Sequence, residues 1–173
     1  FLTRVDLPDS VTTIGNSAFA NCSNLVEVAL GRGVRSIGDH AFAGCGRPWG
    51  SDLPVGLTNI TIPNTVCSIG KSAFSGCNRL TSITIPSGVT RIEDYTFSEC
   101  SGLTSVTIPA GVTSIGDEAF LTFLSSVQAT LGGNVGTTQR VEEVLEAVTK
   151  KDWTPFFDRF VRGTEIPLVP AAK

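Results

Sequence analysis

The apolar positions of the chain recur in one frame with a period of 23 residues. The segment Leu80–Pro86 (LTSITIP) returns 23 residues later as Leu103–Pro109 (LTSVTIP), and Leu57–Pro63 (LTNITIP) precedes it by the same distance. Looser copies begin at Leu2 and Leu25, and nine additional residues separate the second copy from the third. A period of this length is typical of solenoids, in which repeated coils stack on one another.

Each copy predicts a short strand, a second buried edge and a turn. In Leu-x-x-Ile-x-Ile the last apolar residues alternate with polar ones, which indicates a β-strand with one buried face. The following proline cannot donate to a strand ladder and ends the strand. Val11–Gly15 then supplies the second edge and a glycine turn, and the pair Ala18 and Phe19 is expected to interlock with neighbouring coils. In the fourth copy Glu93 replaces the glycine and Thr96 replaces the alanine.

One 23-residue unit cannot bury its apolar residues alone, so neighbours must stack at about 4.8 Å along parallel strands. The frame, closed in four copies by Cys22, Cys45, Cys77 and Cys100, resembles the BspA-like leucine-rich repeat family. The resemblance covers residues 1–120 and implies a secreted or surface-anchored protein that serves adhesion and host-protein binding. We therefore expect an α+β solenoid, a leucine-rich-repeat stack with 23-residue coils and short parallel strands, plus a small C-terminal helical segment.

The expected solenoid occupies residues 1–120 as five repeats, with an insertion near 47–55. Residues 121–138 contain many Ser, Gly and Thr residues and are interpreted as a linker. In residues 139–173, apolar residues at helical spacing, with early Glu and late Lys residues, predict a helical tail. This tail could cover the end of the solenoid or join a larger assembly.

The segment Asp152–Leu168 (DWTPFFDRFVRGTEIPL) resembles the end of the catalytic region of glycyl-aminopeptidase-like metallopeptidases, and the resemblance extends over residues 139–168. Such peptidases bind zinc through His-Glu-x-x-His, but His40 is the only histidine of the chain. The zinc-binding half would therefore lie outside this chain. We predict no catalytic residues, no enzymatic activity and no cofactor. An accessory substrate-binding or structural part of a larger metallopeptidase, or of a multi-subunit assembly, is the alternative function.

Four of the five cysteines share one position of the frame, so stacking aligns them in a row. Their Cα atoms would lie about 5 Å apart, which is within disulfide range. The side chains would point in the same direction, however, so we expect buried free thiols that act as small hydrophobic groups. Cys67 lies outside the row and is the expected exposed thiol. The sequence contains no Cys-x-x-Cys spacing of the kind that binds zinc, so no metal site is predicted.

Strand alternation places two residues of each coil on the side away from the core. These are Arg4 and Asp6, Glu27 and Ala29, Asn59 and Thr61, Ser82 and Thr84, and Ser105 and Thr107. The first two coils are charged there, whereas the last three carry a Ser/Thr/Asn array that could bind a protein surface or a glycan. The array could instead reflect only that threonine is a good exposed strand residue.

The insertion supplies two further candidate binding residues, Arg47 and Trp49. Insertions in solenoids map to loops on one face, often the binding face, and Trp and Arg are enriched among the residues that dominate binding energy. Trp49 could equally fold back and cover apolar surface at the edge of the solenoid.

Composition narrows the function further. The 173-residue chain has 13 basic and 16 acidic residues and a formal net charge of −3, which argues against nucleic-acid binding by bulk charge. The sequence contains no apolar run of about 18 residues, so no membrane span is predicted. The chain contains no methionine and opens inside a copy of the frame, so we expect a piece of a longer or processed protein. The expected function is a non-enzymatic repeat scaffold that binds a protein or glycan partner, with an extracellular or cell-surface role in adhesion implied by the family resemblance.

Overall fold

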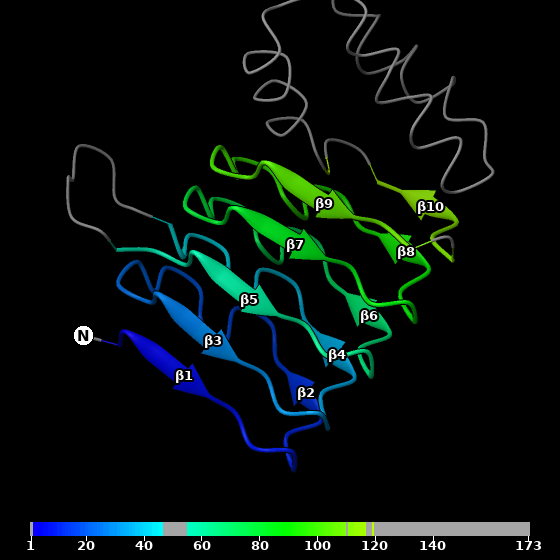
Figure 1. The fold of residues 1–173 in the computed structure, drawn as a ribbon, viewed down its shortest axis with the longest axis horizontal. Coiled ribbons are helices and arrows are strands. Elements are labelled where there is room, and N and C mark those ends of the chain that lie inside the picture. The colour runs from blue at the N-terminus through cyan, green and yellow to red at the C-terminus, as the bar shows by residue number, and fades with distance from the viewer. Residues whose placement is uncertain (1, 47–54, 110, 117–118, 120–173) are drawn as a thin grey trace, which may run out of the picture.

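A computed structural model of the chain describes residues 2–46, 55–109, 111–116 and 119. Within them the chain forms ten short strands that lie in two rows (Figure 1). The first row consists of three-residue strands, which are β1 (Arg4–Asp6), β3 (Glu27–Ala29), β5 (Asn59–Thr61), β7 (Ser82–Thr84) and β9 (Ser105–Thr107). The second row consists of two-residue strands, which are β2 (Thr13–Ile14), β4 (Ser36–Ile37), β6 (Ser68–Ile69), β8 (Arg91–Ile92) and β10 (Ser114–Ile115).

Each coil contributes one strand to each row, and the coils are numbered 1 to 5 in chain order. Within coils 1 to 3 and within coils 4 and 5, neighbouring strands pair in parallel and in register, so Val5 is aligned with Val28 and Val28 with Ile60. In the same way Ile83 of coil 4 is aligned with Val106 of coil 5. The predicted solenoid with short parallel strands is thereby confirmed. The segment of each copy that was predicted as a second buried edge forms the second row of strands.

The Ala-Phe turns form a third connection between coils. Their phenylalanine amides donate to carbonyls of the following coil at 2.8 to 3.0 Å, from Phe19 to Ala41, Phe42 to Ala73, Phe74 to Thr96, and Phe97 to Ala119. The four rings stack with nearly parallel planes and with centroids 5.2, 5.4 and 5.7 Å apart. The expected interlocking of the Ala-Phe pair between coils is confirmed.

The hydrophobic core is a column that follows these stacked positions from coil to coil. Its largest fully buried side chains are Phe42, Phe74, Phe97, Leu25, Ile37, Leu57, Leu80, Ile92, Leu103, Val34 and Val66. Coil 1 is less buried, because no described coil lies before it: Val5, Leu7, Val11, Phe19 and Cys22 are only partly covered. Stability therefore comes from the interfaces between neighbouring coils, as expected for a solenoid.

The strand ladders divide between coils 3 and 4, after β5 and β6. Glycine at the Ile-Gly step lets coils approach closely: the Gly70 amide donates to the Ile37 carbonyl at 2.9 Å, and Gly38 and Gly116 make the equivalent bond to the preceding coil. Glu93 occupies this position in coil 4, and its amide makes no such bond to coil 3 within the described residues. The division of the ladders thus coincides with the loss of this glycine.

Substitution of the stacked glycine should be costly. A Cβ at Gly70 would lie 2.6 Å from the amide nitrogen of Asp39 and 2.4 Å from its Oδ1, so coils 2 and 3 would have to separate. We expect Gly70→Ala to lower the free energy of unfolding by about 1–3 kcal/mol, measured by urea denaturation. Gly15→Ala is the matched control, because the same position in coil 1 has nothing within 4 Å. Equal losses in both variants would contradict this explanation.

The described residues contain no helix. The predicted linker at 121–138 and the predicted helical tail at 139–173 lie outside the described residues. The solenoid part of the predicted α+β class is therefore confirmed, whereas the helical segment and the domain boundaries stay predictions.

Candidate interaction face

The outward side chains of β5, β7 and β9 form one polar array, which we call the polar face. It consists of Asn59, Thr61, Ser82, Thr84, Ser105 and Thr107, all exposed, as the alternation predicted. The residue between each pair points inward, and Ile60 and Ile83 are only 4% and 3% exposed. Within the part of the chain that the structure describes, none of the six polar side chains makes a hydrogen bond. The polar face therefore presents donors and acceptors that its own fold does not use.

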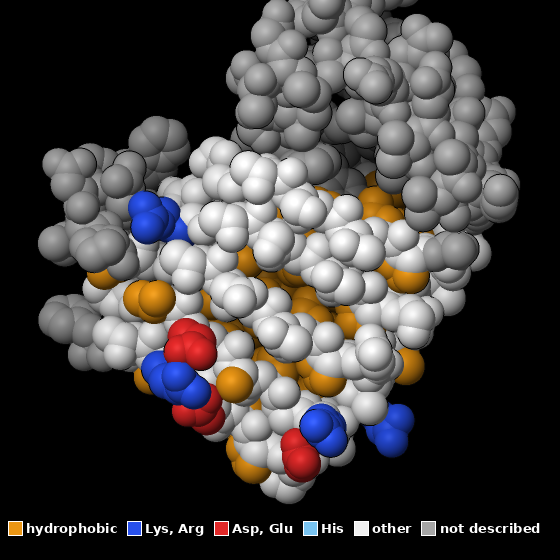
Figure 2. Space-filling model, viewed as in Figure 1, with side chains coloured by type: hydrophobic (Ala, Val, Ile, Leu, Met, Phe, Trp, Pro, Cys, Tyr) orange, Lys and Arg blue, Asp and Glu red, His pale blue; other side chains and the backbone are white. Residues whose placement is uncertain are grey.

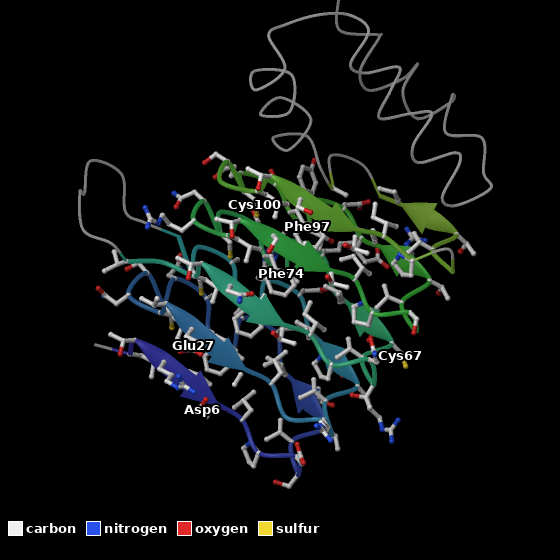
Figure 3. The ribbon with its side chains drawn as sticks, viewed as in Figure 1. Asp6, Glu27, Cys67, Phe74, Phe97 and Cys100 are labelled. Atoms are coloured by element: carbon white, nitrogen blue, oxygen red, sulfur yellow. The ribbon has the colours of Figure 1, made fainter. Side chains whose placement is uncertain are left out.

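The outward charged side chains of β1 and β3, which we call the charged end of this row, are paired with one another. Arg4 contacts Asp6 at 2.8 Å and Glu27 at 2.6 Å, all three being more than half exposed. The hydrogen bond from Arg4 holds the pKa of Asp6 below its usual value, and the same pair raises the pKa of Arg4. Figure 2 shows these charges gathered over β1 and β3, and Figure 3 shows Asp6 and Glu27 on neighbouring strands. The charged end thus forms its ion pairs internally, whereas the side chains of the polar face make no hydrogen bond within the described residues.

A row of threonines beside the polar face has a structural role that the sequence analysis missed. The hydroxyl groups of Thr58, Thr81 and Thr104 donate to main-chain carbonyls of the preceding coil, at 3.4, 3.5 and 3.1 Å. These bonds tie coils 3, 4 and 5 to their neighbours next to the strands. The recurrence of threonine at one frame position was the available signal, but only the structure shows that the hydroxyl points along the stack.

A shallow groove of about 460 Å³ crosses the second row of strands. The glycines of coils 1 to 3 leave it open, and Glu93 of coil 4 also lines it. Asn16 and Asp39 use their side-chain oxygens here, because Oδ1 of each accepts the amide of the next coil at 2.9 Å. Lys71 in turn contacts Asp94 at 3.0 Å, which raises the pKa of the lysine. Most polar groups of the groove are therefore occupied by contacts between coils.

A family model described as a BspA-type leucine-rich repeat region of six copies matches residues 1–50 and 51–140. The chain belongs to this BspA-type leucine-rich repeat family. The match confirms the resemblance on which the expected fold was based. Among curated proteins there is no match to the chain.

Three solved structures are similar to this BspA-type chain. A leucine-rich repeat protein from Bacteroides ovatus is 31% identical, covering 68% of this chain and 34% of its own, with a TM-score of 0.49. A leucine-rich repeat protein of T. pallidum is 26% identical, covering 76% and 71%, with a TM-score of 0.55. A leucine-rich cell surface protein from Faecalibacterium prausnitzii is 29% identical, covering 68% and 38%, with a TM-score of 0.45. The chain thus spans about a third of the Bacteroides protein, and the T. pallidum structure supports the repeat fold.

Two predicted site residues of the BspA-type chain, Arg47 and Trp49, lie outside the described residues. Residues 139–168 lie outside them too, and no comparison supports their resemblance to metallopeptidases. The structure therefore brings together the six residues of the polar face and leaves the insertion a prediction.

The cysteines of the BspA-type repeats are all free, as predicted, but Cys22 of coil 1 is only half-buried, so the predicted burial holds for the other three members of the row. Cys45, Cys77 and Cys100 are buried, and each thiol donates to the carbonyl of a phenylalanine in the preceding coil, at 3.0, 3.2 and 3.1 Å. Burial raises the pKa of Cys45 and Cys100 to about 12, and it also raises that of Cys77. Cys67 is exposed, as predicted (Figure 3). The buried thiols are therefore protonated structural groups and not nucleophiles.

No three His, Cys, Asp or Glu residues among those described are grouped so that they could hold a metal ion. Across the same described ranges, no helix is long and apolar enough to cross a bilayer.

Proposed function

We propose that this chain is a non-enzymatic scaffold that binds a protein partner through the polar face. The observation that carries the proposal is that six exposed polar side chains, aligned on parallel strands, make no hydrogen bond within the described fold. A partner that supplies the missing hydrogen bonds gains them without breaking internal ones. The charged end is already paired, so it offers less to a partner.

Rigidity supports the same proposal. Of the strands that carry the polar face, β7 and β9 are joined by a backbone ladder. Coils 3 and 4, where the ladders divide, are joined by the stacked rings of Phe74 and Phe97 and by the hydroxyl of Thr81. Little conformational entropy is therefore lost when a partner binds, which favours affinity. Arg47 and Trp49 of the insertion complete the proposal as anchor residues, on the grounds of their residue types and of the usual place of insertions in solenoids.

We place this binding at the cell surface, in adhesion, because the BspA-type family resemblance implies secreted or surface-anchored proteins. A glycan partner would use the same hydroxyl and amide groups, so the experiment must separate a protein partner from a sugar. A role for the tail in a larger assembly is a separate proposal, which the polar face does not address.

The test uses the full chain on arrays of immobilised extracellular proteins and of glycans. We expect a protein ligand, and we expect Thr84→Arg, in the middle of the polar face, to weaken its binding at least about tenfold. Ser87→Arg is the control, because it adds the same charge in the same coil at an exposed position outside both strand rows. Equal binding by the two variants would exclude the polar face. Binding to glycans alone would replace the protein partner with a sugar.

A further inference from the structure

We propose that Asn59 is an acceptor site for N-linked glycosylation. Asn59, Ile60 and Thr61 form an Asn-x-Thr triplet in which the middle residue is not proline. This triplet is the acceptor motif for N-linked glycans in exported proteins, and it requires a surface position. The proposal shares with the proposed function the premise that the chain is exported.

The strand geometry satisfies the surface requirement. Asn59 and Thr61 are exposed on the same side of β5, because the alternation buries only Ile60 between them. The Asn59 amide and the Thr61 hydroxyl make no hydrogen bond to any other described residue. A glycan on the side-chain nitrogen of Asn59 would therefore extend into solvent without displacing a packed group.

A second triplet, Asn21-Cys22-Ser23, provides an internal comparison. Asn21 lies in a turn with φ 60°, and its Oδ1 lies close over Gly44 of the next coil, 2.5 Å from where a Cβ would stand. Cys22 is half-buried. Asn21 is exposed, but a glycan there would start from a side chain that lies against Gly44 of the next coil, so the structure favours Asn59.

The reaction requires a lipid-linked oligosaccharide as donor and a transferring enzyme of the secretory pathway. The Nδ2 atom of Asn59 forms a bond to C1 of the first sugar, and the bond from C1 to the carrier's pyrophosphate oxygen breaks. The pyrophosphate leaves with the electron pair, and one amide proton passes to a base of the enzyme. No oxidation or reduction takes place.

A glycan on Asn59 would change which partners the polar face can bind. Asn59 stands opposite Glu27 in the ladder and one strand from β7, so a glycan there would cover the middle of the row. This consequence rests on the proposed function. The glycosylated chain would bind a protein partner more weakly than the bare chain, because a bulky hydrated sugar would stand over Thr61 and Thr84.

The experiment secretes the full chain from mammalian cells behind a signal sequence and measures its mass before and after treatment with an N-glycanase. We expect a glycan that the glycanase removes, converting Asn59 to aspartate in peptide maps. Asn59→Gln and Thr61→Ala should lose it, whereas Thr61→Ser and Asn21→Gln should keep it. The three residues changed in these four variants lie outside the buried core, so equal secretion levels serve as the folding control.

An unmodified Asn59 in the secreted chain, or an unchanged glycan on Asn59→Gln, would overturn the proposal. The binding arm compares the secreted, glycosylated chain with the same chain produced without a glycan in bacterial cells, which keeps Asn59 intact, and we expect about tenfold tighter binding by the bare chain on the protein array. Failure of the proposed function would leave Asn59 occupied with no binding by either form. Failure of the glycosylation site would leave Asn59 unoccupied while binding persists.

Discussion

Phe74→Ala should lower the free energy of unfolding by about 3–5 kcal/mol. Phe74 is fully buried in coil 3, and its ring stacks between Phe42 at 5.4 Å and Phe97 at 5.7 Å. Removing the ring leaves a cavity that touches two interfaces between coils at once. Because a solenoid is held together by such interfaces, the loss should also reduce the cooperativity of unfolding. Urea denaturation followed by circular dichroism measures both the midpoint and the slope.

Phe19→Ala is the matched control for this prediction. Phe19 occupies the same frame position in coil 1, is only partly buried, and among the described residues stacks on Phe42 alone, at 5.2 Å. We expect its loss to cost about 1–2 kcal/mol, in proportion to the smaller apolar area that it buries. If the two variants lost equal stability, the stacked column would not be the element that joins the coils.

The stability of the chain should also fall steeply in alkaline solution, between about pH 9 and about pH 12. Burial raises the pKa of Cys45 and Cys100 from 9.0 to about 12, so the native state keeps these protons while the unfolded chain releases them. The unfolded state then binds fewer protons than the native state, and the free energy of unfolding falls as the pH rises. Each such thiol contributes about 1.4 kcal/mol per pH unit in that window. Below pH 9 both states are protonated and the contribution is constant.

Urea denaturation across this pH window, in the presence of a thiol reductant, measures the slope. Cys100→Ala should make the curve shallower by about 1.4 kcal/mol per pH unit, because one of the buried thiols no longer titrates in the unfolded chain. Lysine and tyrosine residues titrate in both proteins and cancel in the comparison. Parallel curves for the two proteins would rule out the buried thiols as the cause.

The location of the polar face could be predicted from the sequence, because strand alternation depends only on local order. The pattern Asn59-Ile60-Thr61 already predicts two exposed side chains around a buried one, and the structure confirms that placement. What the pattern could not show is which polar groups are already used. Thr58 directly precedes β5 and Thr61 ends it, yet Thr58 donates to the Val26 carbonyl, whereas the hydroxyl of Thr61 has no partner in the described fold.

For the cysteines, too, burial could be predicted from the sequence, whereas the hydrogen-bond partner of each thiol could not. Four cysteines at one frame position predict a buried row of free thiols, and Cys67 outside the row predicts an exposed one. The direction in which each thiol points depends on the position of the neighbouring coil. Cys77 reaches the Phe42 carbonyl because the coil before it places that carbonyl over the sulfur. No local pattern carries this information.

Repetition and alternation along the chain were enough to predict the period of the solenoid, the inward and outward residues of each strand and the row of free cysteines. How closely the coils approach could be learned only from the folded chain. It showed that Gly70 admits a backbone hydrogen bond between coils 2 and 3, and that the ladders divide where Glu93 replaces glycine. It also showed turn residues such as His40 and Tyr95 in the left-handed region, with φ of 55° and 58°. These features arise from contacts between residues one coil apart, and their energies depend on distances that a linear pattern does not contain.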